Sequence, residues 1–283
     1  MNLSGRRTSS NVEDRRRGGG KVTLGIGGTI VVALIVWLMG GNPLSVLQTA
    51  DLGSITQNGE TYTPTPQEEQ LATFASQILA ATEDMWTAEF AKMGRTYTPP
   101  KLVLFKSSVK SGCGGATASS GPFYCSADQR VYIDLSFFTD MKRQLGADGD
   151  FAYAYVIAHE VGHHVQYLLG TLDEAHQAMS RANEKESNRI SVRLELQADF
   201  FAGLWAHHDN QRFASLEDGD IEEGLTAASV IGDDYLQKKA RGYTVPDSFN
   251  HGTSAQRMRW LKKGLLGGNF ADGDTFSPKY ENL

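Results

Sequence analysis

The chain of 283 residues suits one large or two modest globular domains, and its 40% hydrophobic and 21% charged residues are typical of a folded protein. This composition excludes a chain that is wholly disordered, collagen-like or stabilised mainly by disulfides. The net charge of −6 is uneven, because residues 1–21 carry +4 and residues 22–283 therefore carry −10. An acidic body repels phosphate backbones, so we expect no nucleic-acid partner.

An apolar segment follows this basic head. Residues 22–50 contain no charge, and their first part, VTLGIGGTIVVALIVWLMG at 22–40, is long enough to cross a bilayer as one transmembrane helix. Because the basic residues precede it, the positive-inside rule places residues 1–21 in the cytoplasm as a tail. The sequence thus predicts a single-pass protein of the cell inner membrane, with its N-terminus cytoplasmic and its main domain periplasmic or otherwise extracytoplasmic. A cleaved signal peptide is the alternative.

The folded domain is predicted to begin after a linker. Residues 41–66 are rich in Gly, Thr, Gln and Pro, as linkers are. In residues 67–93, apolar side chains recur at spacings of three and four, which predicts an amphipathic helix at the start of a domain spanning 67–283. Segments 101–105 and 130–138 have the composition of short strands, which either pair or flank a third strand. Segment 130–138 alternates polar and apolar residues. This pattern fits an edge strand that binds an extended peptide, and it also fits a core strand.

Helices dominate the rest of the chain. The turn signal GADGD offers Asp148 or Asp150 as the N-cap of the first of them. The expected fold class is therefore α+β, mostly helical with a small sheet. Helical spacing of apolar residues predicts helices over about 151–169, 184–207, 218–240 and 254–266.

Two cysteines, Cys113 and Cys125, lie in the stretch SGCGGATASSGPFYC, whose glycines and serines favour turns. In an oxidising compartment they would form a disulfide that closes a surface loop. Two unrelated buried thiols are the alternative. A zinc-binding pair is disfavoured, because eleven residues separate the cysteines and no nearby histidine completes a set.

The helix predicted over 151–169 carries the pattern HEVGH, from His159 to His163. Residues four apart lie on one face of a helix, so both imidazoles can reach a single metal ion. Glu160 lies beside them, where its carboxylate can contact a water on that ion without being a ligand. The composition predicts only about 0.01 matches to this pattern by chance. His164 points away from this face of the helix. Gly162 lowers the helix propensity in the middle of the motif, and the need for a small residue beside a metal ion would explain its presence.

A catalytic zinc site needs three protein ligands, so that a fourth position stays open for water. Glu195 begins the motif ELQAD, in which Asp199 lies on the same helical face and could hold a ligand histidine through its ring N–H. Two acids four residues apart repel each other on a helix surface and destabilise the helix. A functional role in metal binding would explain why both are present. The candidates for the third ligand are Glu195, Cys113, Cys125, His176, His207, His208 and His251.

The motifs HEVGH and ELQAD together resemble those of gluzincin metallopeptidases. The whole chain, from NVEDRRR through GPFYC, VYIDLSFF and HGTSAQR, is similar to the bacterial neutral zinc metallopeptidase family of membrane-anchored peptidases. This resemblance implies a zincin-like metallopeptidase domain behind the transmembrane helix, with Zn2+ as its cofactor. It implies that His159, His163 and Glu195 are zinc ligands, that Glu160 is the general base, and that Asp199 is the carboxylate behind a ligand histidine.

The predicted function is that of a membrane-anchored zinc endopeptidase acting on extracytoplasmic polypeptides. Zinc activates a water, and Glu160 passes that water's proton to the leaving amine. Thermolysin-like relatives have an oxyanion-binding tyrosine without an obvious equivalent here, so His251 in NHGTSAQR is the candidate donor, with a surface or helix-cap histidine as the alternative. The alternative function is a non-enzymatic, zinc-stabilised binding or chaperone-like module of the cell envelope. Glu160 favours the enzyme, because structural zinc sites usually close with a fourth side chain.

Overall fold

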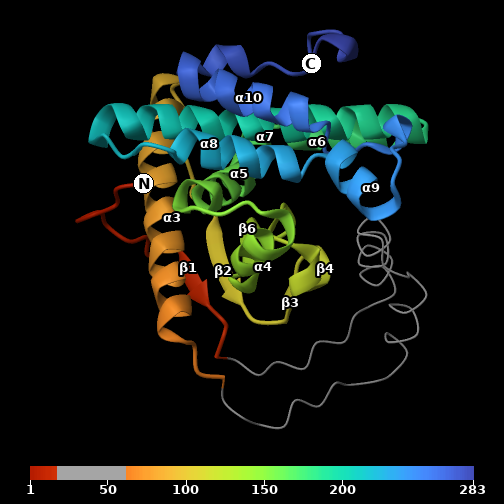
Figure 1. Cartoon of the computed structure of the whole chain (residues 1–283). Helices are drawn as coiled ribbons and strands as arrows, with labels where there is room; N and C mark the ends of the chain where they lie inside the picture. The colour runs from red at the N-terminus through yellow and green to blue at the C-terminus, as the bar shows by residue number, and fades with distance from the viewer. Residues whose placement is uncertain (18–61) are drawn as a thin grey trace.

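A computed structural model describes residues 1–17 and 62–283, in which helices pack on and around a small sheet (Figure 1). This confirms the predicted class, α+β and mostly helical. The helices are α3 (Pro66–Lys92), α4 (Ser136–Asp140), α5 (Asp150–Leu169), α6 (Thr171–Met179), α7 (Glu184–Phe213), α8 (Asp220–Val230), α9 (Asp233–Arg241) and α10 (Ser254–Gly267). The strands are β1 (Val12–Asp14), β2 (Lys101–Phe105), β3 (Ser108–Ser111), β4 (Gly114–Thr117), β5 (Phe123–Cys125) and β6 (Arg130–Asp134).

The main sheet has four strands in the order β1-β2-β6-β5, and β3 and β4 form a separate antiparallel hairpin. β1, β2 and β6 are parallel, whereas β5 runs antiparallel to β6. The two predicted strands therefore pair directly. β6 is an inner strand, so the edge-strand interpretation of 130–138 is wrong, and β5 occupies that edge. The strand also ends at Asp134, whose carboxylate accepts a hydrogen bond from Ser136 N at 3.0 Å and begins the turn into α4.

The sheet is buried on both faces. Alternate residues of β2 and β6, such as Leu104 and Ile133, face the main core together with side chains of α3 and α5. On the opposite face, Tyr132 and its neighbours form a second cluster with Val109 and Ala116 of the β3–β4 hairpin. The hairpin thus explains why the polar face predicted for β6 is buried as well.

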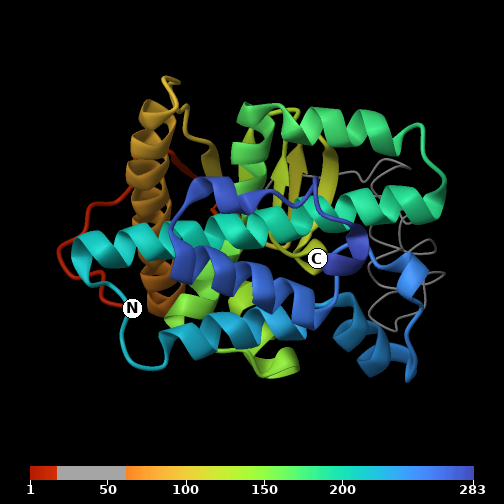
Figure 2. The same ribbon diagram turned by 90° about the horizontal axis from the view of Figure 1, so that it is seen from above.

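Above the sheet, α7 crosses the molecule with α8 and α10 beside it (Figure 2). α7 and α10 approach closely where Gly203 meets Gly264, since a Cβ on Gly264 would lie 2.2 Å from the carbonyl oxygen of Phe200. α5 and α7 approach closely at Gly162, where a Cβ would lie 3.1 Å from the Ala198 backbone. A glycine is therefore needed at position 162 because the two helices pack closely there. The sequence interpretation, that a small residue is needed beside a metal ion, is wrong.

Most of the predicted helices are confirmed, with changes at their ends. α7 continues to Phe213, beyond the predicted end. The helix predicted over 218–240 is two helices, α8 and α9, which are separated at Gly232; a Cβ there would lie 2.4 Å from Ser254 N. α5 follows Gly149 without a side-chain cap, so neither predicted aspartate is its N-cap. The three-residue strands β1 and β5, the hairpin, α4 and α6 were not predicted.

Residues 1–17 pack against the rest of the fold. β1 pairs with β2, and the side chains of Met1 and Leu3 are buried in the main core. The described fold therefore includes residues that the sequence predicts as a separate tail. The predicted span at 22–40 and most of the predicted linker lie outside the described residues. Within 1–17 and 62–283, no helix is both long and apolar enough to cross a membrane.

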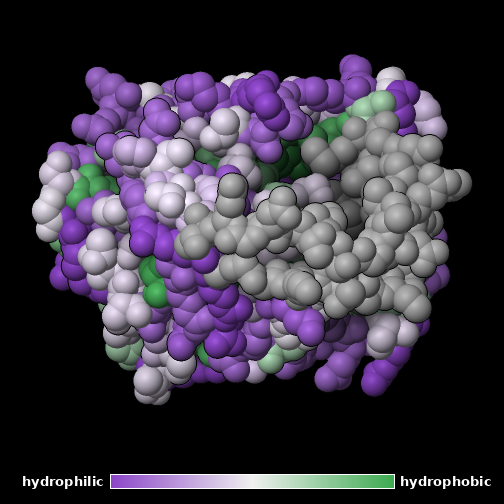
Figure 3. All heavy atoms as spheres, turned by 90° about the horizontal axis from the view of Figure 1, so that it is seen from below, coloured by the Kyte–Doolittle hydropathy of each residue, from purple (hydrophilic) through white to green (hydrophobic). Residues whose placement is uncertain are grey.

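Figure 3 shows one face, on which hydrophilic side chains predominate among the described residues. The large apolar side chains that are most exposed are Phe213, Tyr235, Tyr243, Val245 and Leu266.

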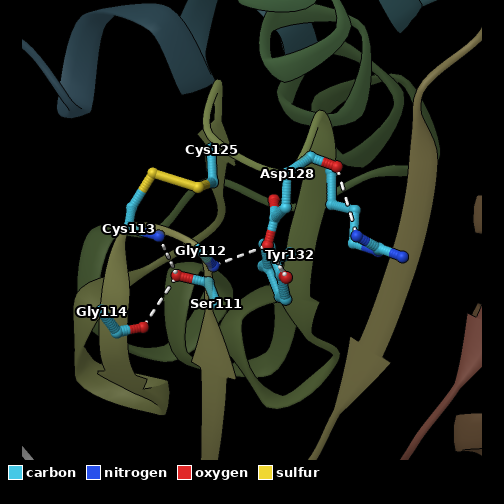
Figure 4. The surroundings of a disulfide bond; sticks show 8 residues. Ser111, Gly112, Cys113, Gly114, Cys125, Asp128 and Tyr132 are labelled. Carbon is cyan, nitrogen blue, oxygen red and sulfur yellow. Dashed lines mark hydrogen bonds between the residues drawn. A yellow bond between two sulfur atoms is a disulfide. The ribbon is translucent and has the colours of Figure 1, made fainter.

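Cys113 and Cys125 form the predicted disulfide, with their Cα atoms 5.8 Å apart (Figure 4). The bond joins the turn of the β3–β4 hairpin to the end of β5. Beside it, Asp128 Oδ2 accepts hydrogen bonds from Gly112 N and from the Tyr132 hydroxyl, both at 2.6 Å. The hairpin is thus fixed to the edge strand, and neither cysteine is free to bind a metal.

Candidate metal centre

The two predicted motifs meet where α5 passes α7. His159 and His163 lie one turn apart on α5, and Glu195 lies on α7. His159 Nε2 is 3.3 Å from Glu195 Oε2, and His163 Nε2 is 3.4 Å from Glu195 Oε1. Among the residues that the structure describes, no further His, Cys, Asp or Glu joins this group of ligand atoms. The fold thus brings together the three ligands that the resemblance implies.

Hydrogen bonds to the other ring nitrogens orient both histidines. His159 Nδ1 donates to Asp199 Oδ1 at 2.8 Å, and His163 Nδ1 donates to Gln166 Oε1 at 2.9 Å. Both partner oxygens can only accept, so each Nδ1 carries a proton and each Nε2 is the nitrogen left to bind a metal. Asp199 therefore contacts the ring of His159, a candidate ligand, as the sequence interpretation expects, and Gln166 contacts the ring of His163 in the same way without having been predicted.

A buried arginine lies behind Asp199. Arg257 of α10 donates from Nε and Nη2 to the two carboxylate oxygens of Asp199, both at 2.9 Å. Its Nη2 also donates to the Tyr155 hydroxyl at 3.2 Å, and this hydroxyl donates to Asp199 at 2.6 Å. Asp199 is 0% exposed and Arg257 3% exposed, so each charge depends on the other for compensation. Arg257 is the last residue of HGTSAQR, which was the only sequence signal for it.

The start of α10 sets the position of Arg257. Thr253 Oγ1 accepts a hydrogen bond from Gln256 N at 3.2 Å, and Gln256 Oε1 accepts one from Thr253 N at 2.9 Å. This capping box begins the helix one turn before Arg257. The close crossing of Gly203 and Gly264 then holds α10 against α7, and Arg257 reaches Asp199 across the interface.

The charges of the cluster favour a cation between the histidines. Burial lowers the pKa of His159, but Asp199 and Glu195 outweigh burial and raise the pKa to about 10. Burial raises the pKa of Asp199, but Arg257 and His159 outweigh it and lower the pKa to about 2. In the same way, the two histidines outweigh burial and hold the pKa of Glu195 well below its usual value. Both carboxylates are therefore ionised at neutral pH and stabilise positive charge at this point.

Glu160 follows His159 on α5 and is 9% exposed. Within the described residues, its carboxylate has no hydrogen bond or ion pair with another side chain. A carboxylate without a side-chain partner can accept a hydrogen bond or a proton from a water molecule or a substrate group at the site.

His251, the predicted oxyanion donor, precedes α10 and pairs with an aspartate that was not predicted. His251 Nδ1 donates to Asp233 Oδ1 at 3.2 Å, and Asp233 Oδ2 accepts from the backbone N–H groups of His251 and Gly252 at 2.7 and 2.9 Å. Burial lowers the pKa of His251, but Asp233 and Glu195 raise it above its usual value. The ring is 45% exposed and lies within the electrostatic reach of Glu195, outside the group of ligand atoms.

Comparison with known proteins identifies the family. The family model described as "Putative neutral zinc metallopeptidase" matches residues 1–276. The chain belongs to this family. The uncharacterized protein YpfJ of Escherichia coli K12 is 49% identical over 286 residues, which cover 98% of this chain and 99% of YpfJ. The uncharacterized protein Rv2575 of Mycobacterium tuberculosis H37Rv is 41% identical over 191 residues, 64% of each chain. No solved structure matches the chain.

The family is one of zinc metallopeptidases, which implies a Zn2+ cofactor, and the residues present fit this ion. A tetrahedral zinc ion bound at about 2.0–2.1 Å places its ligand atoms about 3.3–3.4 Å apart. The two Nε2 atoms lie 3.3 and 3.4 Å from the Glu195 oxygens. Two imidazoles and one carboxylate are also the donor set of one class of catalytic zinc site. His159, His163 and Glu195 would therefore hold the ion.

His164 faces away from the ligands, as predicted. Its Nε2 donates to the carbonyl oxygen of Thr98 at 2.7 Å, and its Nδ1 accepts from the Tyr124 hydroxyl at 2.9 Å. Burial lowers the pKa of His164 to about 4, so the ring is neutral. The other ligand candidates, His176, His207 and His208, also lie outside the group of ligand atoms.

Proposed function

We propose that this member of the family is a zinc-dependent endopeptidase that hydrolyses peptide bonds in polypeptide substrates. The observation that supports it most strongly is the convergence of His159 Nε2, His163 Nε2 and the Glu195 carboxylate, with Glu160 next to the first ligand. Each of these side chains has a distinct task in the hydrolysis of an amide.

The number of ligands favours catalysis over a structural metal site. Structural zinc sites are closed by four side chains, whereas catalytic sites leave one position for water or substrate. The group contains three ligand residues within the described chain. A structural site would also have no use for the unpaired carboxylate of Glu160. These two features argue against the zinc-stabilised binding module that was the alternative function.

The proposed reaction assigns proton transfer to Glu160. Zinc, when bound, would lower the pKa of a water molecule and polarise the substrate carbonyl. Glu160 would take the proton of this water as the water oxygen attacks the carbonyl carbon, and would then give the proton to the leaving nitrogen. Asp199 would hold the His159 ring through both transfers. Because Arg257 keeps Asp199 ionised, Asp199 would not compete for the proton.

His251 would donate from Nε2 to the oxyanion that develops on the substrate. Its Nδ1 is engaged by Asp233, which leaves Nε2 as the free nitrogen and favours the protonated ring. A charged donor at the developing oxyanion stabilises the transition state more than the ground state. Asp233 would act on the reaction only by positioning this ring.

The substrate backbone would bind along β5. Among the described strands, β5 pairs with β6 alone, and it contacts α5 through Tyr124, whose hydroxyl donates to His164. An extended peptide can add to such an edge through main-chain hydrogen bonds, with little dependence on its sequence. The disulfide at Cys125 fixes the end of this strand.

The substitution Glu160→Gln tests the proposal. We expect the purified full chain to keep one zinc ion and its melting temperature, and to lose about 10²–10⁴-fold in cleavage of a quenched fluorescent peptide library. Zinc should be retained because Glu160 is not a ligand, and cleavage should fall because an amide cannot accept the proton.

Two variants provide the controls. Glu195→Gln should lose both zinc and cleavage, and Glu174→Gln, at an exposed glutamate of α6, should lose neither. Native cleavage by Glu160→Gln would remove the general base from the mechanism. A native chain that holds one zinc ion but cleaves no member of the library would support the structural-zinc module instead.

A further inference from the structure

The five arginines of residues 1–17 all pair with carboxylates. Arg6 donates to both oxygens of Asp209, at 2.6 and 3.2 Å, and its guanidinium lies 3.8 Å from the centre of the Phe213 ring. Asp209 is 4% exposed, so this pair is largely shielded from water. The remaining pairs are Arg7 with Glu83 and Asp84, Arg15 with Glu13, Arg16 with Asp14 and Glu69, and Arg17 with Glu69.

The backbone of this segment completes the main sheet. β1 lies parallel to β2, with Val12 opposite Leu102. Leu102 N donates to the carbonyl oxygen of Asn11, and Arg15 N donates to that of Leu104, both at 2.8 Å. These bonds engage the backbone N–H and C=O groups along one edge of the inner strand β2, and the other edge of β2 is paired with β6.

The last residues of the segment contact the start of α3. Arg16 Nη1 donates to the carbonyl oxygen of Glu68 at 3.1 Å, and the Arg16 side chain is 2% exposed. Arg16 and Arg17 lie 3.1 and 2.9 Å from the carboxylate of Glu69. The points at which the chain leaves the described fold and returns to it are therefore next to each other.

We infer that residues 1–17 are a permanent part of the metallopeptidase fold and lie in the same compartment as residues 62–283. A chain that crossed a membrane once between these two parts would separate β1 from β2 and Arg6 from Asp209 by the thickness of the bilayer. The geometry is therefore incompatible with a cytoplasmic tail and a catalytic domain on the other side.

This inference also explains the uneven charge of the chain. The basic head carries +4 and the remainder −10. In the structure, Arg6, Arg7, Arg16 and Arg17 neutralise acidic side chains of the remainder. The positive-inside rule applies to residues that stay at the membrane surface. Arginines that are used in ion pairs within a folded domain give no information on orientation, so the sequence argument for a cytoplasmic N-terminus loses its basis.

Labelling of single cysteines in the full chain tests the inference. Ser10 and Ser180 are both exposed, so Ser10→Cys and Ser180→Cys should fold as the native chain does. Each variant would be treated with a membrane-impermeant maleimide in spheroplasts of a bacterial expression host, before and after lysis with detergent. The native chain, whose two cysteines are joined, gives the background.

We expect the cysteines at positions 10 and 180 to show the same pattern of maleimide labelling. Labelling of both before lysis, or of both only after lysis, supports the inference and also identifies the compartment. Labelling of one position before lysis and of the other only after lysis would overturn it. This readout does not depend on zinc or on peptide cleavage, so its failure is separate from a failure of the proposed function.

A matched pair of substitutions tests whether the contact supports the fold. Arg6→Gln removes a pair with the rest of the fold, whereas Arg15→Gln removes only the pair with Glu13 inside the same segment. We expect Arg6→Gln to lower the melting temperature of the purified chain by about 5–10 °C and Arg15→Gln by less than about 2 °C. Equal effects of the two changes would contradict a permanent docking of the segment.

Discussion

Two histidines on α5, five residues apart, have pKa values that are shifted in opposite directions. His159 lies against Asp199 and Glu195, which outweigh burial and raise its pKa to about 10. His164 lies on another face of the helix, against the Thr98 carbonyl and the Tyr124 hydroxyl. Among the described residues it has no acidic partner, and burial lowers its pKa to about 4. Both rings are buried, so burial alone does not distinguish them.

The difference between the two histidines comes from the elements that each one faces. α7 and α10 supply two carboxylates and one guanidinium to the side of His159, whereas β5 and the segment before β2 supply only neutral groups to the side of His164. Only the first side stabilises a cation. The identity of a histidine in a helix therefore does not determine its role, and substitutions on the two sides should have different consequences.

The largest effect is expected on the charged side, from Arg257→Met. Removal of Arg257 leaves Asp199 buried without its main counter-charge, which should lower the free energy of unfolding by about 3–5 kcal/mol. A misplaced Asp199 no longer orients His159, so zinc affinity should fall by about 10–100-fold. Urea denaturation and competitive zinc titration measure the two effects. Arg259→Met, two residues further along α10 at an exposed position, is the control. Native stability together with native zinc affinity in Arg257→Met would contradict this account.

His251 is an intermediate case, because it is half exposed and has one acidic partner, Asp233. We expect His251→Gln to reduce peptide cleavage by about 10²–10³-fold, as the loss of an oxyanion donor does. Zinc content and stability should remain native, because the ring is not a ligand. The matched control is His176→Gln, at an exposed histidine of α6. A loss of zinc in His251→Gln would place this residue in the metal centre and not beside the substrate.

The sequence predicts what depends on local spacing. HEVGH lies within five residues of one helix, so the period of the helix alone brings His159 and His163 together. Glu195 and Asp199 are also one turn apart, but spacing alone left Glu195 among several candidates, and the family resemblance selected it. The disulfide is likewise a contact between the ends of one short loop.

The residues that sequence analysis missed come from elements that are distant along the chain. Arg257 contacts His159 across 98 residues, and no periodicity connects the two. The strands β1 and β5 have three residues each, too few to show an alternating pattern. Because β5 was not predicted, the sequence analysis could not show that β6 has a neighbouring strand on each side. These features depend on how the helices and strands pack, which a single sequence does not specify.

The smallest effect is expected on the neutral side, where His164 makes stability depend on pH. Its pKa is about 4 in the folded chain and about 6.5 when unfolded, so the folded state binds fewer protons between these values. Its contribution is therefore fully present above about pH 6.5 and is lost as the pH falls towards 4, by about 2 kcal/mol at pH 5. We expect the stability difference between the native chain and His164→Gln to shrink by this amount from pH 7.5 to pH 5, as measured by urea denaturation. Other titrating groups, the proposed zinc ligands included, are common to both chains and cancel in the difference. A difference that stayed constant with pH would mean that the fold does not lower the pKa of His164, and the contrast between the two sides of α5 would be wrong.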